Sequence, residues 1–234
     1  MYRAGWTLQA PPVDPGPIIA LRDAFLETVG ADSGELEWKC FSWDGSRRWY
    51  AHQALTDAGF QPQPEEAVLV AETSVAIRTA GDAAPGITVR VATSLEDREV
   101  LLHADSVSRI VWGEENLPSQ VALGYWARPA TTDPPHLSIH VAYHRNVPVA
   151  FGRFQITPHS HFGGLWGGAT IPEARRLGYY RALVGSRAHE ARGHRCQWLM
   201  VDANPQTSMP ILLNLGFREL GRTRPYQYRN PQAG

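Results

Sequence analysis

The chain has 234 residues, of which 43 % are hydrophobic, and its formal net charge is −1. This length and composition allow one large domain or two small ones with packed cores. A net charge near zero creates no field that favours nucleic acid or an anionic membrane, so we expect neither as a partner. No apolar run is long enough to span a bilayer and the N-terminus lacks a signal-peptide pattern, so a cytoplasmic protein is expected.

The first third of the chain is expected to hold one small unit. Residues 10–17, APPVDPGP, indicate an irregular lead-in, and residues 79–86, TAGDAAPG, indicate a linker. Between them, residues 35–72 predict a strand, a short helix that ends in Gly-Phe, and a second strand. We therefore predict two domains, at residues 1–85 and 86–234.

The second part alternates strand and helix signals. The expected strands cover residues 87–93, 137–143, 149–156, 161–170, 197–203 and 217–228. The expected helices cover 94–111 and 118–127, lie within 174–193, and cover 206–216. Ser94, followed three residues later by Asp97, suits the start of the first helix. The order β-α-α-β-β-β-α-β-α-β predicts an α/β (mixed α+β) fold, with a central mixed sheet flanked by helices.

The two parts share a short sequence pattern. Leu55-x-x-x-Gly59-Phe60 in the first part corresponds to Leu212-x-x-x-Gly216-Phe217 in the second, each between two expected strands. Such an internal echo suggests a tandem or half-duplicated fold.

Residues 174–180, ARRLGYY, form a cationic turn at the start of an expected helix. A helix N-terminus presents unpaired N–H groups and a partial positive charge, and Gly178 leaves room for close approach of an anion. Arg175 and Arg176 add two guanidinium groups to the same turn. The turn therefore predicts a pyrophosphate cradle, and an ordinary exposed helix start is the alternative. The P-loop GKS/GKT and the GxGxxG fingerprint are both absent.

Residues 170–184, TIPEARRLGYYRALV, resemble motif A of the GNAT superfamily of N-acyltransferases. The family pattern is roughly V-x-P-x-x-[R/Q]-x-x-G-x-[G/A]-x-A-L, and the matching residues are Pro172, Arg175, Gly178, Ala182 and Leu183. Residues 204–217, NPQTSMPILLNLGF, resemble a later motif of the same family. The resemblance implies a GNAT fold with a mostly antiparallel sheet over residues 87–230, and a truncated, degenerate GNAT-like unit before it.

The family resemblance also implies a donor, which is acetyl-CoA or another acyl-CoA. By this resemblance, backbone groups of Ala169, Thr170 and Ile171 would hold the pantetheine arm, and Asn204 would lie near the pantetheine or the reaction centre. The pyrophosphate would contact backbone N–H groups of Arg175, Arg176, Leu177, Gly178, Tyr179 and Tyr180.

Three positions depart from the family pattern. Arg176 replaces a frequent glycine, and Tyr180 replaces the last Gly or Ala, where its ring is expected to narrow the pyrophosphate site. Leu212 stands where the family often has a tyrosine that protonates the leaving thiolate. A general acid must therefore come from elsewhere.

Four residues are candidates for acid–base catalysis. Glu115, next to Glu114, follows the first helix in a loop that often lines the acceptor site in this family, and a solvated acidic turn is the alternative. His161, near His159, precedes the glycine-rich strand, where a polar strand edge is the alternative. No third ligand accompanies this His-x-His pair, so no metal is expected.

The other two candidates lie near the C-terminus. Asp202 ends a predicted strand and could act as a base, or could cap the following helix. Tyr228 could supply the missing acid, or Tyr226 in its place, since alternate strand residues point to opposite faces. Trp112 and Trp126 could wall an acceptor pocket.

The sequence thus predicts an acyl-CoA-dependent N-acyltransferase in which a small-molecule amine attacks the donor directly. One alternative is an acyltransferase whose donor thioester is bound to an acyl-carrier protein, and another is a non-catalytic CoA-binding module. A monomer or a homodimer is expected.

Overall fold

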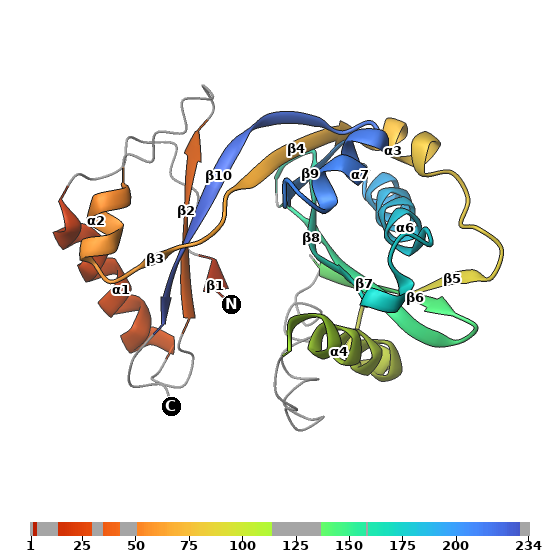
Figure 1. Ribbon diagram of the computed structural model, residues 1–234, viewed down its shortest axis with the longest axis horizontal. Helices are drawn as coiled ribbons and strands as arrows, with labels where there is room; N and C mark the ends of the chain where they lie inside the picture. The colour runs from red at the N-terminus through yellow and green to blue at the C-terminus, as the bar shows by residue number, and fades with distance from the viewer. Residues whose placement is uncertain are drawn as a thin grey trace. The chain divides into compact units, whose positions relative to one another are not determined.

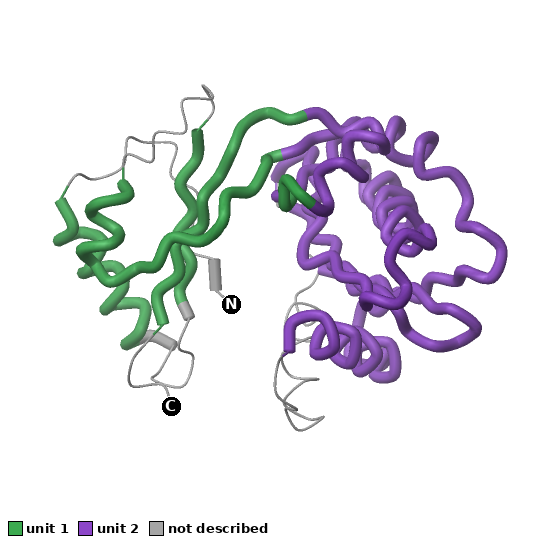
Figure 2. Tube along the Cα trace, in the orientation of Figure 1, with its two compact units in different colours: residues 1–68, 203–206, 219–234 green, residues 69–202, 207–218 purple. Residues whose placement is uncertain are grey.

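The computed structural model describes residues 2–3, 14–29, 35–42, 51–113, 137–157 and 159–229. The chain divides into two compact units, which interleave along the sequence (Figure 2). Unit 1 comprises residues 1–68, 203–206 and 219–234, and unit 2 comprises residues 69–202 and 207–218. This division separates the parts of the chain that make most of their contacts within themselves, and it does not test the predicted domain boundary at residue 85. Whether residues 1–85 are a degenerate copy of the fold stays a prediction.

Unit 1 is a small sheet with helices packed on it (Figure 1). Its elements are β1 (Tyr2–Arg3), α1 (Pro15–Val29), β2 (Glu35–Ser42), α2 (His52–Asp57), β3 (Gln61–Pro62) and most of β10 (Arg218–Arg229). β2 pairs in parallel with β1 and antiparallel with β10, and β3 is also antiparallel to β10. Ile18, Leu36, Leu55, Phe60 and Tyr226 are buried together in its core.

Helix α1 overlaps the predicted irregular lead-in, so that prediction is wrong from Pro15 onward. The Asp14 carboxylate accepts a hydrogen bond from the Gly16 N–H (2.8 Å) and thus satisfies one free donor at the helix start. Prolines are tolerated in a first helical turn because their missing N–H would have no intrahelical partner there. Proline content alone was therefore misleading.

Unit 2 holds the longer elements. They are α3 (Thr73–Ala80), β5 (Ile87–Ala92), α4 (Arg98–Trp112), β6 (Leu137–His144), β7 (Val147–Ile156), β8 (Phe162–Thr170), α6 (Tyr179–Gly193), β9 (Trp198–Ala203) and α7 (Ser208–Asn214), and β4 (Glu66–Glu72) crosses the boundary between the units. The strand order is β9-β8-β7-β6-β5. All neighbours are antiparallel except β8 and β9, which are parallel. The predicted mixed, mostly antiparallel sheet is confirmed.

Helices cover both faces of this sheet (Figure 1). Val141 lies in the core cluster that includes the buried side of α4, whereas Ala142 lies in the cluster that includes Leu183 of α6. Consecutive strand residues point to opposite faces, so α4 and α6 pack on opposite sides. β6 is consequently buried along nearly its whole length.

The predicted element order in the second part is confirmed where the structure describes it. Ser94 begins a short 3-10 turn, η1 (Leu95–Asp97), with the expected capping box, and α4 follows. The second helix expected at residues 118–127 lies outside the described residues. α3 extends into the predicted linker as far as Ala80, and Gly81 ends it with φ +59°.

The two Leu-x-x-x-Gly-Phe segments have the same local structure. The N–H of Phe60 donates to the Leu55 carbonyl (2.9 Å), and the N–H of Phe217 donates to the Leu212 carbonyl (3.1 Å). In both segments the glycine has a left-handed backbone, with φ +87° and +84°, as in helix ends that close with a glycine. The sequence echo therefore reports a repeated structural motif.

Candidate active site

The loop between β8 and α6 contains two residues with left-handed backbone. A single 3-10 turn, η3 (Pro172–Ala174), follows β8. Arg176 then has φ +65°, and Gly178, directly before α6, has φ +91°. Glycine adopts such angles without steric cost, so Gly178 sets the direction in which α6 leaves the loop. The positive φ at Arg176 also explains why a glycine suits that position.

Helix α6 begins with unpaired backbone donors. No side chain of the described residues caps its N-terminus, and the Ala182 N–H is the first to reach back to Gly178 (3.0 Å). The preceding N–H groups thus lack intrahelical acceptors. Arg175 and Arg176 are both exposed at this end of the helix, and Arg175 Nε donates to the Thr170 carbonyl (3.2 Å). Free N–H groups, the helix dipole and two guanidinium groups are the features that bind anions at helix starts, and we call residues 174–180 the anion-binding turn for this predicted role.

Two contacts hold the first turn of α6 in place. Arg181 donates through Nε and Nη2 to the carbonyls of Ala80 and Thr79 at the end of α3 (2.7 Å each). The Tyr179 hydroxyl lies 2.6 Å from His144 Nδ1 at the end of β6. The turn is therefore anchored to a second helix and to the sheet.

The Tyr180 ring packs under the sheet. A Cβ atom built on Gly168 of β8 would lie only 2.8 Å from Tyr180 Cε2, and the Arg187 guanidinium carbon lies 6.0 Å from the ring centroid. The absence of a side chain at Gly168 provides the space that the ring occupies, and the effect of the ring on the pyrophosphate site stays a prediction. Burial raises the pKa of the Tyr180 phenol.

Strand β8 has an open edge near the turn. Its parallel pairing with β9 covers only Phe162–Gly164 and Trp198–Met200, although β8 continues to Thr170. Beyond Gly164, the edge that faces β9 carries backbone groups available to an extended ligand. An arm that contains amide groups, such as pantetheine, suits this edge.

A bulge lies in this open part of β8. Its register with β7 shifts between Phe151 and Arg153, so Gly152 alone opposes Gly167 and Gly168. Gly167 has φ +54°, which accommodates the extra residue. A bulge redirects backbone N–H groups out of the ladder, so this one can present a donor to a ligand on the open edge.

Other predicted pantetheine residues lie at the end of β8. Ala169 is buried and Thr170 is half-buried. The Ile171 N–H donates to the Val149 carbonyl (2.9 Å), and its own carbonyl accepts from the Ala174 N–H (3.1 Å). Ile171 therefore offers a ligand its side chain rather than backbone groups. Leu177, also predicted, is exposed at the turn.

Asp202 and Asn204 lie at the end of β9. Asp202 is half-buried on the strand, and Thr207 rather than Asp202 is the N-cap residue of α7. Asn204 Oδ1 accepts from the Gln206 N–H (2.8 Å), an Asx turn that leads toward α7. Their predicted roles toward substrate and donor stay predictions.

The structure does not bring His161 together with the turn. His161 is exposed immediately before β8, and its carbonyl accepts from the N–H groups of Gln197 and Trp198 (2.9 and 3.0 Å). Thr170 lies nine residues further along an extended strand, which corresponds to about 25–30 Å. His161 thus lies at the end of β8 opposite the anion-binding turn.

Tyr228 packs within unit 1. Its ring lies 5.6 Å from that of Phe60, and the Arg22 guanidinium lies 4.8 Å from its centroid. Tyr226 is fully buried, its hydroxyl lies 3.0 Å from His52 Nδ1, and burial raises its pKa to about 12. These positions give no support to either tyrosine as the acid, and Leu212 is fully buried in place of the family's tyrosine.

Part of the predicted acceptor side lies outside the described residues, namely Glu114, Glu115 and Trp126. Trp112, the last residue of α4, is described and is 48 % exposed. Its ring meets Phe151 of β7 edge-on at 5.5 Å. An exposed aromatic surface therefore lies on the α4 face of the sheet.

A buried polar network was missed in the sequence. His140 of β6 is fully buried, with Nε2 2.6 Å from Glu190 Oε2 and Nδ1 2.8 Å from Ser186 Oγ, both on α6. Ser138 Oγ also donates to Glu190 (2.8 Å). Ser186 and Glu190 are four residues apart and thus on one helix face, which is the signal that could have revealed the network. It fixes α6, and with it the turn, on the sheet.

This network predicts that acid destabilises the fold. Burial lowers the pKa of His140 below its usual value of about 6.5, so between these two values the unfolded chain binds a proton that the folded chain does not. Stability is therefore expected to fall as pH drops below about 6.5, by up to about 1.4 kcal/mol per pH unit. Burial alone would raise the pKa of Glu190, but its hydrogen bonds with His140 and Ser138 and the nearby histidine charges lower it. The stability that ionised Glu190 contributes is therefore lost only below about pH 4.5. Denaturant unfolding between pH 5 and 8 measures this slope. An equally steep slope in His140→Gln would contradict the assignment.

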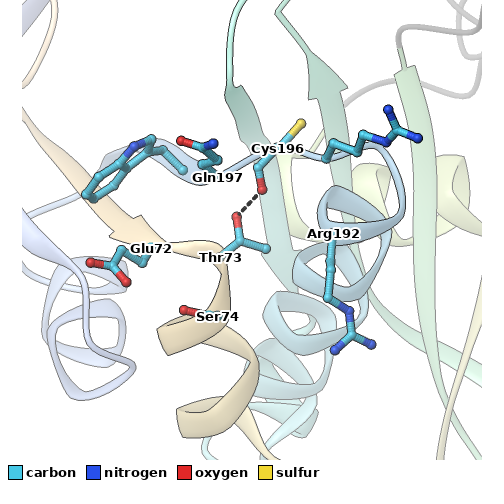
Figure 3. A pocket seen from close by; sticks show the side chains of 8 residues that line it. Glu72, Thr73, Ser74, Arg192, Cys196 and Gln197 are labelled. Atoms are coloured by element: carbon cyan, nitrogen blue, oxygen red, sulfur yellow. Dashed lines mark hydrogen bonds between the residues drawn. The ribbon is translucent and has the colours of Figure 1, made fainter.

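A surface cavity of about 530 Å³ lies at the other end of α6 (Figure 3). It is lined by the start of α3 and by the segment between α6 and β9, where Thr73 Oγ1 donates to the Cys196 carbonyl (2.8 Å). Arg192 and Arg195 also line it. Since the turn lies at the N-terminus of α6, this cavity takes no part in the candidate site.

Within the part of the chain that the structure describes, no group of three or more His, Cys, Asp or Glu residues is placed to hold a metal ion. None of the helices among the described residues is long and apolar enough to cross a membrane.

Several solved structures share this architecture. The chain is similar to a GCN5-related N-acetyltransferase from Kribbella flavida, with a TM-score of 0.62 at 15 % identity, over 94 % of this chain and 78 % of that one. It is also similar to a tandem GNAT protein from the clavulanic acid biosynthesis pathway, with a TM-score of 0.62 at 12 % identity, over 91 % and 68 % of the two chains. A GCN5-related N-acetyltransferase from Sphaerobacter thermophilus matches with a TM-score of 0.55 at 13 % identity, over 91 % and 67 %. These similarities establish a shared fold.

The search of curated proteins found no match. The sequence profile of the acetyltransferase (GNAT) family matches residues 102–217, which include most of α4, the glycine-rich strand, the anion-binding turn and the second Gly-Phe motif. Residues 102–217 therefore form a domain of the acetyltransferase (GNAT) family.

Proposed function

We propose that the protein is an N-acyltransferase that moves an acetyl or other acyl group from acyl-CoA to the amine of a small molecule. The observation that carries this proposal is the start of α6, where uncapped N–H groups follow Gly178 beside Arg175 and Arg176. A pyrophosphate requires such a concentration of donors and positive charge.

The neighbouring strand edge supports the same donor. The open edge of β8 begins after Gly164 and ends close to the turn, so an amide-bearing arm could run along it while its pyrophosphate rests on α6. The bulge at Gly167 and Gly168 lies on this path and offers an N–H group that can polarise a thioester carbonyl. CoA has both an amide-bearing pantetheine arm, which suits the strand edge, and a pyrophosphate, which suits the turn.

The proposed reaction is direct attack by the acceptor amine on the thioester carbonyl. A C–N bond forms, the C–S bond breaks, the amine loses a proton and the thiolate leaves with one. Both described cysteines, Cys40 and Cys196, are buried free thiols whose pKa burial raises, so neither suits a covalent acyl intermediate. The exposed ring of Trp112 can serve as an apolar wall for the acceptor.

Free acyl-CoA is the donor that we favour over a carrier-bound thioester. The carrier-bound alternative assumed that the Tyr180 ring crowds the pyrophosphate site. The ring packs against Gly168, which weakens the reason for that alternative. Arg176 accommodates the positive φ in place of a glycine and adds charge beside the helix start.

The test is a thiol-release assay with acetyl-CoA and a panel of primary amines. We expect release that depends on the amine and saturates with both substrates. Binding of acetyl-CoA without release for any amine would favour the non-catalytic alternative. Release only from acyl-carrier thioesters would favour the carrier-dependent one.

A further inference from the structure

Arg187 of α6 is a buried cation. The residue is 1 % exposed, its Nε donates to the Leu183 carbonyl (3.0 Å), and its Nη1 donates to the Arg153 carbonyl (3.4 Å). The remaining nitrogen, Nη2, is buried and makes no hydrogen bond of good geometry among the described residues, and the neutral Tyr180 phenol is the polar side chain that interacts with the guanidinium. Arginine keeps its charge even when burial lowers its pKa, as it does here.

No carboxylate of the described residues pairs with this charge. The ion pairs in that part of the chain do not include Arg187, and Glu190, three residues further along, hydrogen-bonds His140 and Ser138 instead. An unpaired buried charge opposes folding, and replacing such a group by an apolar one is often stabilising. Its presence therefore calls for a role other than stability.

The guanidinium lies against Gly152 of β7, the strand position that faces the bulge of β8. A Cβ atom built on Gly152 would be 2.8 Å from Arg187 Nη1, and Gly152 is the residue that alone opposes Gly167 and Gly168. The Tyr180 ring fills the adjacent space under Gly168. Arg187 and Tyr180 thus support the bulge from the α6 face, while the open edge of β8 remains free.

We infer that Arg187 is a positioning residue for acyl transfer, whose buried positive charge acts through the β8 bulge to strengthen the polarisation of the donor's thioester carbonyl. This inference rests on the proposed function. When the amine attacks, negative charge develops on the carbonyl oxygen, and an unneutralised cation in a low-dielectric interior stabilises it over several ångströms.

The test replaces Arg187 by methionine, which has a similar shape and no charge. Isotope-edited infrared spectroscopy of bound acetyl-CoA, labelled at its carbonyl carbon, reports polarisation directly. We expect the carbonyl stretch to shift to lower frequency on the wild-type protein and to lose much of that shift in Arg187→Met. The kcat is expected to fall about 10- to 100-fold, while KM and the calorimetric Kd for acetyl-CoA stay within about threefold.

Melting temperature separates this role from a structural one. Arg187→Met is expected to melt at the same temperature as the wild type or higher, because it removes an unpaired buried charge. Arg187→Lys keeps a charge and should retain most of the infrared shift. If Arg187→Met does not fold, the comparison of Arg187→Lys with the wild type provides the test. Arg192→Met, an exposed arginine on the same helix, is the matched control and should leave all readouts unchanged.

An unchanged carbonyl stretch and kcat in Arg187→Met would overturn the inference. Lower stability in both Arg187 variants with an unaltered carbonyl shift would also overturn it and would make Arg187 a packing residue. A wild-type protein that binds acetyl-CoA without acylating any amine would contradict the proposed function, and the infrared shift would still decide whether Arg187 polarises the donor.

Discussion

Replacing Gly178 by valine is expected to lower the affinity for acetyl-CoA about 100-fold. Gly178 has φ +91°, a conformation that a β-branched residue adopts only with strain. To relieve that strain the loop must turn away, and the N–H groups at the start of α6 then no longer converge on one anion. The same strain should cost about 2 kcal/mol of folding stability. Calorimetric titration and denaturant unfolding measure the two effects.

The matched control is Gly193→Val at the C-terminal end of the same helix. Gly193 has no positive φ, and a Cβ atom there would meet nothing within 4 Å. This variant should bind acetyl-CoA as the wild type does. If Gly178→Val also bound with wild-type affinity, the turn would not be the donor site.

Replacing Glu190 by alanine is expected to cost about 3 kcal/mol of folding stability. Glu190 accepts hydrogen bonds from Ser138 and from the fully buried His140, whose Nε2 would keep only the longer contact with Ser138 Oγ (3.2 Å). The resulting loss should appear as a lower denaturant midpoint with an unchanged m-value.

Glu99→Ala is the matched control, because it removes an ion pair of similar length whose side chains are exposed rather than buried. Glu99 lies 2.7 Å from Arg90, close to the 2.6 Å between Glu190 and His140, but both partners of the Arg90–Glu99 pair are largely exposed. Water and salt screen this pair, so its loss should leave stability unchanged within error. Equal losses in the two variants would show that burial of His140 does not determine the cost.

The anion-binding turn could be predicted because its chemistry lies within a few consecutive residues. Gly178, Arg175 and Arg176 reveal a helix start with free donors without any knowledge of the rest of the fold. The order of helices and strands along the chain could be predicted in the same way, since each strand of unit 2 is bounded by glycine, proline or polar turns. Helix α1 was missed because prolines in a first helical turn resemble those in a loop.

The contacts around the site could not be predicted, because they join residues that are distant in sequence. The Tyr180 ring was expected to narrow the pyrophosphate site, since nothing in the sequence indicates that it would pack against Gly168. The burial of His140 could not be predicted from its strand alone, because no local pattern shows that a helix covers that face of the sheet. Helices cover both faces of β6, so the polar face is buried as well.

The candidate catalytic residues were the least predictable part. His161 and Tyr228 have suitable chemistry, but His161 lies at the far end of β8, and Tyr228 packs on Phe60 in unit 1. Side-chain type alone does not say where along a strand a ligand binds. The backbone features at Gly167 and Gly168, which the sequence showed only as glycine content, locate the candidate site more directly.

The most direct test of the central claim is calorimetric titration of the wild-type protein with acetyl-CoA and, separately, with S-acetylpantetheine, which lacks the pyrophosphate. If the turn at α6 holds the pyrophosphate, acetyl-CoA should bind with micromolar affinity and S-acetylpantetheine about 100-fold more weakly. Equal affinities for the two, or no binding of acetyl-CoA, would contradict the assignment of this turn as the donor site.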